Sequence, residues 1–185
     1  MRQFKEQFVS SARELKQLRT LVVASMMIAI AAVLGFFTIQ IGDFIKIGFS
    51  FIANEITALL FGPVVGSITA GIADIIKYFI KPTGPFFPGF TISAVVGGLI
   101  YGLVLYQKKL SIKRIVVAKV LVAVIVNIFM NTYWLSLLYD KGYMLFLPGR
   151  IIKQLVMVPI ETVIFYVIVF ILAKANVLKQ LKVKA

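Results

Sequence analysis

The most constraining feature of this 185-residue sequence is a series of apolar stretches, each close to the length that a helix needs to cross a bilayer. Such a helix needs roughly 20 mainly apolar residues to cross about 30 Å of hydrocarbon. The stretches lie at about 21–41, 44–61, 64–80, 90–106, 115–138 and 151–173. Apolar residues make up 61% of the chain and charged residues only 15%, which is too few to cover a soluble protein. We therefore expect an all-α integral membrane protein with six transmembrane helices.

The second stretch is the least regular of the six. Asn54 and Glu55 interrupt it, and an FGP motif at 61–63 ends it, because proline clashes with the preceding helical turn. A tilted, broken or partly re-entrant segment is therefore an alternative to a full span at 44–61. The expected organisation has three parts: a tail over 1–20, a six-helix membrane domain over 21–173 and a second tail over 174–185.

The basic residues predict the orientation. Six spans place both tails on one side, and most lysines and arginines belong to that side: Arg2, Lys5, Arg13, Lys16, Arg19, Lys108, Lys109, Lys113, Arg114, Lys174, Lys179, Lys182 and Lys184. The opposite loops and helix ends hold fewer: Lys46, Lys77, Lys81, Lys141, Arg150 and Lys153. Cytoplasmic loops carry the excess of positive charge, so we expect both tails in the cytoplasm. The net charge of +13 then reports topology rather than nucleic-acid binding.

The composition also argues against an enzyme. The chain contains no cysteine and no histidine, so thiolate metal sites, disulfides, imidazole bases and catalytic triads are excluded. We expect no cofactor and no metal. No GxxxxGK[ST] phosphate-binding loop is present, so the chain cannot couple transport to ATP by itself. A ligand-binding protein without its own energy source would need partners.

Polar residues at helical spacing mark a candidate pocket near the outer side. Asn127, Asn131 and Trp134 share one face of the fifth stretch. On the sixth, a stripe comprises Arg150, Gln154, Met157 and Glu161, with Lys153 beside it. Amides facing lipid would stay unpaired, so these faces should point inward. Hydrogen bonding between the two helices is one explanation. The other is a pocket that binds a polar heterocycle and an anionic group.

Aromatic and charged residues extend this candidate pocket. The proline-rich segment 81–90 supplies Phe86, Phe87 and Phe90. Trp134 and the pair Phe86 and Phe87 could stack on the ring of a ligand. Asp74 and Lys77 lie three residues apart and could pair with each other or contact a ligand. Glu55 is expected to be structural, as a buried group bonded to neighbouring helices. The predicted substrate-binding residues are Asp74, Lys77, Phe86, Phe87, Phe90, Asn127, Asn131, Trp134, Arg150, Lys153 and Gln154.

Small residues recur at four-residue and three-residue spacing on two other stretches. Those of the third stretch are Gly62, Gly66, Ala70 and Ala73, and we expect them to serve internal packing. Those of the first are Ser25, Ala29 and Ala32. A face of small residues permits close helix approach, so this second set could dock another membrane subunit.

Two longer sequence segments resemble those of a known family. The run LFGPVVGSITAGIAD at 60–74, followed by PTGPFFPGFTIS at 82–93, resembles the substrate-binding S components of energy-coupling factor (ECF) vitamin transporters. The segments NTYWL at 131–135 and LPGRIIKQ at 147–154 are similar to the folate-specific branch. The resemblance spans about residues 20 to 173.

This resemblance implies six helices and a high-affinity vitamin pocket that faces outside, built largely by helices four to six. It also implies docking of the first three helices on a transmembrane T component driven by two ATPase subunits. The ligand would be folate, with ATP used only by the partners, and the location a bacterial plasma membrane. The family's first-helix docking motif is AxxxA, and this sequence departs from it: the nearest approximations are Ser25–Ala29 and Ala31–Gly35.

The residues suit folate, which carries a pterin edge, aromatic rings and two carboxylates. Another vitamin, riboflavin-like or thiamine-like, is an alternative, although cationic thiamine does not suit Arg150 and Lys153. An autonomous small-molecule carrier is a second alternative. A membrane enzyme that uses Asp74 and Glu55 is a third, weaker one.

Overall fold

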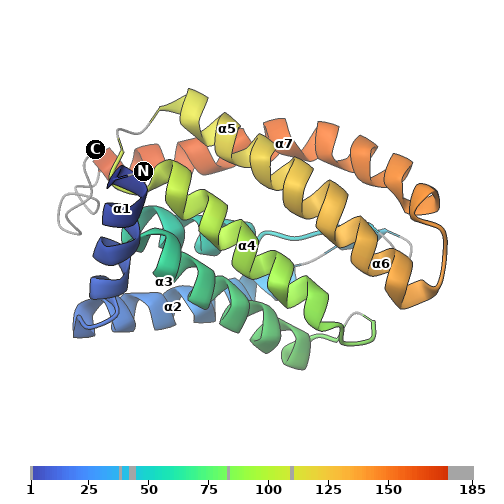
Figure 1. The fold of residues 1–185 in the computed structure, drawn as a ribbon, viewed down its shortest axis with the longest axis horizontal. Coiled ribbons are helices and arrows are strands. Elements are labelled where there is room, and N and C mark those ends of the chain that lie inside the picture. Colours follow the sequence, from blue (N-terminus) through green and yellow to red (C-terminus); the bar gives the residue numbers. More distant parts are fainter. Residues whose placement is uncertain (1, 38, 42–44, 83, 109–110, 175–185) are drawn as a thin grey trace.

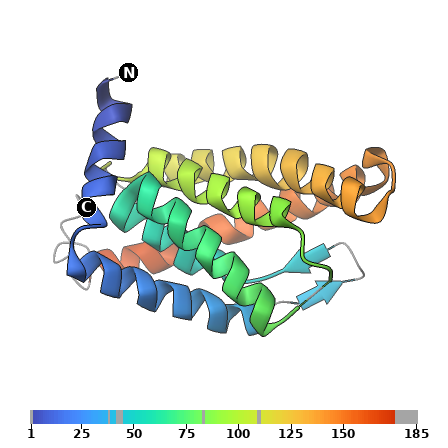
Figure 2. The same cartoon turned by 60° about the horizontal axis from the view of Figure 1, so that its bottom comes forward.

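The computed structural model describes residues 2–37, 39–41, 45–82, 84–108 and 111–174. The elements along this described chain are α1 (Arg2–Glu14), α2 (Leu18–Phe36), β1 (Ile39–Ile41), β2 (Ile45–Ile47), α3 (Phe51–Ile80), α4 (Pro88–Leu105), α5 (Ile112–Val122), a π-helical segment η1 (Ala123–Met130), α6 (Asn131–Tyr139) and α7 (Tyr143–Lys174). Helices α2 to α7 run along one long axis, and α1 crosses one end of the bundle (Figures 1 and 2).

The prediction of a helical membrane protein is confirmed, but the count of spans differs. Five helical segments of the described chain are long and apolar enough to cross a bilayer: α2, α3, α4, the continuous run α5–η1–α6, and α7. Helix α7 leaves most of its surface uncovered by the rest of the protein, which suits contact with lipid tails. Six separate spans are not seen, because α3 contains the two stretches predicted at 44–61 and 64–80.

Helix α3 is a hairpin of two arms rather than one rod. Gly62 has φ 88° and ψ −172°, a conformation that favours glycine, and Pro63 follows it. A Cβ added at Gly66 would lie 2.9 Å from the Cα of Ala58, so the second arm folds back along the first. The predicted break at 61–63 is therefore confirmed. The first arm, from Phe51 to Phe61, is only ~16 Å long at 1.5 Å per residue, and it is enclosed by protein.

A short β-hairpin precedes α3, and the all-α prediction did not include it. Strands β1 and β2 pair antiparallel, with Ile39 opposite Ile47 and Ile41 opposite Ile45. Residues 45–47 were assigned to the second apolar stretch, because a short apolar run has no periodicity that distinguishes strand from helix. The hairpin lies at the end of the bundle remote from α1 (Figure 2).

The small residues of α3 pack internally, as predicted. A Cβ on Gly98 of α4 would lie 2.4 Å from the carbonyl oxygen of Gly66. A Cβ on Gly102 would lie equally close to Pro63. The backbones of α3 and α4 therefore touch along this seam, which only glycine permits. The seam fixes the wall behind the cavity described below.

The segment predicted as an N-terminal tail contains a helix that packs on the bundle. Ser11 of α1 is fully buried against the turn of α3, and Gln7 donates a 3.2 Å hydrogen bond to the carbonyl oxygen of Tyr106. Helix α1 and the end of α7 lie at the same end of the bundle (Figure 1). Four of the basic residues used to predict the orientation lie outside the described part of the chain: Lys109, Lys179, Lys182 and Lys184.

Candidate functional site

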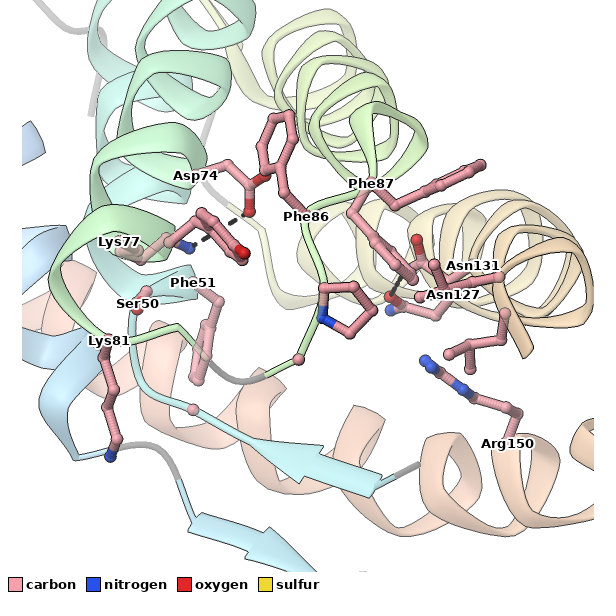
Figure 3. Close-up of a pocket in the computed structure, with 18 of the residues that line it drawn as sticks. Ser50, Phe51, Asp74, Lys77, Lys81, Phe86, Phe87, Asn127, Asn131 and Arg150 are labelled. Atoms are coloured by element: carbon pink, nitrogen blue, oxygen red, sulfur yellow. Dashed lines mark hydrogen bonds and ion pairs between the residues drawn. The ribbon is translucent and has the colours of Figure 1, made fainter. Parts of the chain in front are cut away.

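A cavity of about 450 Å³ opens at the end of the bundle opposite α1. Its walls come from both arms of α3, the loop between α3 and α4, the run η1–α6, and the start of α7. Figure 3 shows Asp74 and Lys77 on one side, and Asn127, Asn131 and Arg150 on the other. Most of the predicted site residues line this cavity: Asp74, Lys77, Phe86, Phe87, Phe90, Asn127, Asn131, Arg150 and Lys153.

The two predicted asparagines form a short chain of amides. Asn131 donates a 3.2 Å hydrogen bond to Asn127, which donates a 3.4 Å bond to Gln154 of α7. Hydrogen bonding between the two helices and a pocket wall were proposed as alternatives, and these amides do both. The acceptor oxygen Oδ1 of Asn131 is buried and has no partner among the described residues. A buried acceptor of this kind is expected to meet a donor from a ligand or water.

Cationic side chains surround the cavity. Lys77 lies 4.0 Å from Asp74, whose other oxygen accepts a 3.0 Å hydrogen bond from Thr91. Arg150 extends into the cavity (Figure 3), and its buried Nε has no partner within the described chain. Lys153 lies one helical turn further along α7. An anionic group would find charge-assisted hydrogen bonds here.

Aromatic rings from the α3–α4 loop form another wall. Phe87 stands between Phe90 and Trp134, with ring centroids 6.0 Å and 5.7 Å away. Trp134 was predicted to stack on the ligand, but its ring packs behind Phe87, and its Nε1 donates a 3.1 Å hydrogen bond to Ser93. Trp134 therefore supports the wall and is not one of the residues that line the cavity.

A deeper cavity of about 320 Å³ continues toward the middle of the bundle. It shares Phe51, Asn54 and Lys153 with the outer cavity and adds Gln154, the remaining predicted residue. Glu161, at the end of the predicted α7 stripe, lines it as well.

A buried ion-pair cluster closes this deeper cavity. Lys119 of α5 lies 2.6 Å from Glu55 of α3 and 2.9 Å from Glu161 of α7. Glu55 is 1% exposed, so its predicted structural role, as a buried group bonded to a neighbouring helix, agrees with the structure. The ammonium of Lys119 also lies 4.1 Å from the centre of the Phe51 ring. The cluster links α3, α5 and α7.

Sequence reasoning missed several of these residues. No role was predicted for Lys119, although a charge within a 28-residue apolar helix is a signal for a functional or paired group. Phe51, Asn54 and Tyr78 also line the outer cavity. Tyr78 follows Asp74 by four residues, a helical spacing that could have indicated it. No spacing pattern linked Phe51 and Asn54 to the predicted residues, because the turn at Gly62 brings the first arm of α3 to the cavity.

The predicted docking residues on α2 differ in their exposure. Ser25 and Ala29 are exposed, and the hydroxyl of Ser25 donates a hydrogen bond to the carbonyl oxygen of Leu21 on its own helix. Ala32 is buried. The docking role of this stripe stays a prediction, with Ser25 and Ala29 as the residues available to a partner.

Comparison with known proteins places this architecture in a family. A sequence model described as the ECF transporter, substrate-specific component matches residues 19–169. The chain belongs to this family. The family is a component of transporters and is not an enzyme family.

Individual relatives agree with this assignment. The chain is 36% identical over 152 residues to a protein named folate transporter FolT from Clostridium novyi, covering 82% of this chain and 88% of that protein. It is 34% identical over 154 residues to folate transporter FolT from Leuconostoc mesenteroides, covering 80% and 83%.

Two solved structures share the fold. One is described as FolT bound with folic acid; it superposes with a TM-score of 0.74 and 32% identity, covering 81% of this chain and 92% of that one. The other, described as the S component of a bacterial ECF transporter, gives a TM-score of 0.65 at 23% identity and supports the fold alone. Helix α1 precedes the residues that the family model matches.

Proposed function

We propose that this chain is the folate-binding subunit of an ECF-type importer. The observation that carries the proposal is the outer cavity itself, where amides, aromatic rings and cations meet in about 450 Å³. The names of the relatives, two folate transporters and a structure bound with folic acid, point to the same ligand.

Each part of folate has a chemical counterpart in the cavity. Its two carboxylates suit Arg150 and Lys153, since guanidinium and ammonium groups form strong hydrogen bonds to carboxylates. Its aromatic rings suit Phe87 and Phe90. The unpaired oxygen of Asn131 can accept a hydrogen bond from a ligand N–H group.

The energy for uptake would come from partner chains. The described residues lack a phosphate-binding loop, and the full sequence contains no GxxxxGK[ST] motif. We therefore propose that a T component and two ATPase subunits complete the importer, with Ser25 and Ala29 of α2 at the docking face. The chain would need no cofactor of its own and would reside in a bacterial plasma membrane, with α1 on the cytoplasmic side.

Reconstituted vesicles test this division of labour. Radiolabelled folate should accumulate only when this chain is combined with the T component and both ATPases and when ATP is supplied inside a vesicle of matching orientation. Accumulation by the chain alone would instead identify it as an autonomous carrier. Vesicles that hold the partners without this chain are the matched control and should take up no folate.

A further inference from the structure

The sign of the charge changes with depth along the connected cavities. Among the described residues, the outer cavity is lined by Lys77, Lys81, Arg150 and Lys153 against one carboxylate, that of Asp74. At the floor of the deeper cavity, the two carboxylates of Glu55 and Glu161 share one ammonium, that of Lys119. A ligand with an anionic end and a hydrogen-bond-donating end would therefore bind in one direction only, with its donors at the floor.

Glu161 is the member of the floor cluster that a ligand can reach. Its side chain is 23% exposed and lines the deeper cavity, whereas the side chains of Glu55 and Lys119 are each 1% exposed. Lys119 occupies only one of its two carboxylate oxygens, Oε2, at 2.9 Å. Within the described chain no donor is assigned to the other oxygen, Oε1. A carboxylate can accept about four hydrogen bonds, so this one retains capacity for a ligand.

The walls above Glu161 form a slot suited to a flat ring. Phe51, Phe90, Tyr101 and Met157 line it. Gly97 of α4 also lines it, and a Cβ built there would meet no atom within 4 Å. Gly97 is buried in the protein, so the open space beside it is an empty volume inside the bundle. The slot is therefore apolar on its faces and carries hydrogen-bonding groups, Gln154 and Glu161, at one edge.

We infer that Glu161 recognises the ring of the ligand by accepting hydrogen bonds from two adjacent N–H groups of a 2-amino-4-oxo heterocycle. Lys119 is then a positioning residue that holds this carboxylate in place. The inference rests on the proposed function, because the pterin ring of folate carries that pair of donors. Two parallel N–H bonds to one carboxylate give both strength and direction. The flavin ring edge instead presents one N–H between two carbonyl oxygens, which a carboxylate would repel, so the same residue would exclude riboflavin.

The test compares two ligands on two proteins. The ligands are folate and an analogue whose 2-amino group is replaced by methyl, and the proteins are the wild type and Glu161→Gln, each titrated in detergent. The wild type should bind folate at least tenfold more tightly than the analogue, because a charge-assisted bond is lost. Glu161→Gln should weaken folate binding at least tenfold and change analogue binding by less than about threefold.

Glu6→Gln is the matched control, because Glu6 is an exposed carboxylate on α1. This variant should leave both affinities unchanged.

Two outcomes would overturn the inference. Glu161→Gln could bind folate as the wild type does, or it could weaken both ligands equally, as expected of a purely structural ion pair. A thermal melt of each variant in detergent accompanies the titrations. If Glu161→Gln does not fold, Gly97→Leu provides the test: filling the slot should weaken folate binding at least tenfold, and unchanged binding would place the ring elsewhere.

The proposed function fails by a different result. A wild-type protein that binds no folate at all contradicts the folate assignment itself. A wild-type protein that binds folate and does not discriminate against the analogue contradicts only the role of Glu161.

Discussion

The hydroxyl of Ser11 donates a 2.6 Å hydrogen bond to the carbonyl oxygen of Phe61, and this contact fastens α1 to the turn between the two arms of α3. The Ser11 hydroxyl oxygen, Oγ, in turn accepts hydrogen bonds from the backbone amides of Val64 at 3.0 Å and Val65 at 3.3 Å. These amides begin the second arm of α3 and would lack partners at a helix start. One side chain of α1 therefore satisfies both ends of the turn.

Ser11→Ala should therefore destabilise the fold and leave the binding site intact. Removing the hydroxyl leaves a buried carbonyl oxygen and two buried or half-buried amides without this partner, at a cost of about 1–3 kcal/mol. The melting temperature in detergent should fall, while folate affinity should stay within about threefold of wild type, because the turn lies at the end of the bundle away from the cavity. Ser111→Ala is the matched control, since Ser111 precedes α5 and its side chain makes no capping hydrogen bond. An unchanged melting temperature would show that α1 does not stabilise the turn.

Arg150→Ala should weaken folate binding by roughly tenfold or more. The buried Nε of Arg150 has no partner within the described chain, and a charge-assisted bond to a carboxylate contributes about 1.5–3 kcal/mol. Isothermal titration in detergent measures the loss, and the melting temperature without ligand should change little. Normal binding by this variant would place Arg150 at the lipid interface instead of the site. Arg114→Ala, on the exposed start of α5, is the control.

Trp134→Ala should weaken binding indirectly, through Phe87. The indole ring lies 5.7 Å from the Phe87 ring and is held by its hydrogen bond to Ser93, so its removal leaves the aromatic wall unsupported. We expect a smaller loss of folate affinity than for Phe87→Ala, together with normal assembly with the partner subunits. A loss equal to or larger than that of Phe87→Ala would mean that Trp134 itself contacts the ligand. Titration of both variants makes the comparison.

Ala29→Leu should reduce assembly with the T component and leave folate binding unchanged. Ala29 is exposed on α2, where added bulk would prevent a close helix crossing. Ile30→Leu is the control for pull-down with the partner subunits, because Ile30 is an exposed neighbour and the substitution keeps the side-chain volume. Ala32→Leu should behave differently: Ala32 is buried, so the larger side chain should lower the melting temperature. If Ala29→Leu loses folate binding as strongly as assembly, α2 does not carry the docking face.

Much of this architecture follows from local sequence rules. The apolar stretches indicate the long helices, and the FGP motif predicts the turn at Gly62, because both effects depend on residues close in sequence. The same rules bring Asn127 and Asn131 together, since their four-residue spacing is a helical one. They also place both on the face that lines the cavity.

Other features depend on contacts between distant segments. Glu55 and Lys119 are 64 residues apart, and no local pattern indicates that the turn of α3 brings them within 2.6 Å. Helical spacing groups Trp134 with the asparagines, but packing against Phe87 and Ser93 decides where its ring lies. The interaction of Ser11 with the α3 turn is a tertiary contact of the same kind.

Titration of the purified chain alone with folate in detergent, without ATP or partner subunits, tests whether the chain is a folate-binding subunit. A folate-binding subunit should show saturable binding of one folate per chain, unaffected by ATP and much tighter than binding of riboflavin or thiamine. Absence of folate binding by a folded protein, or tighter binding of riboflavin or thiamine, would contradict this function.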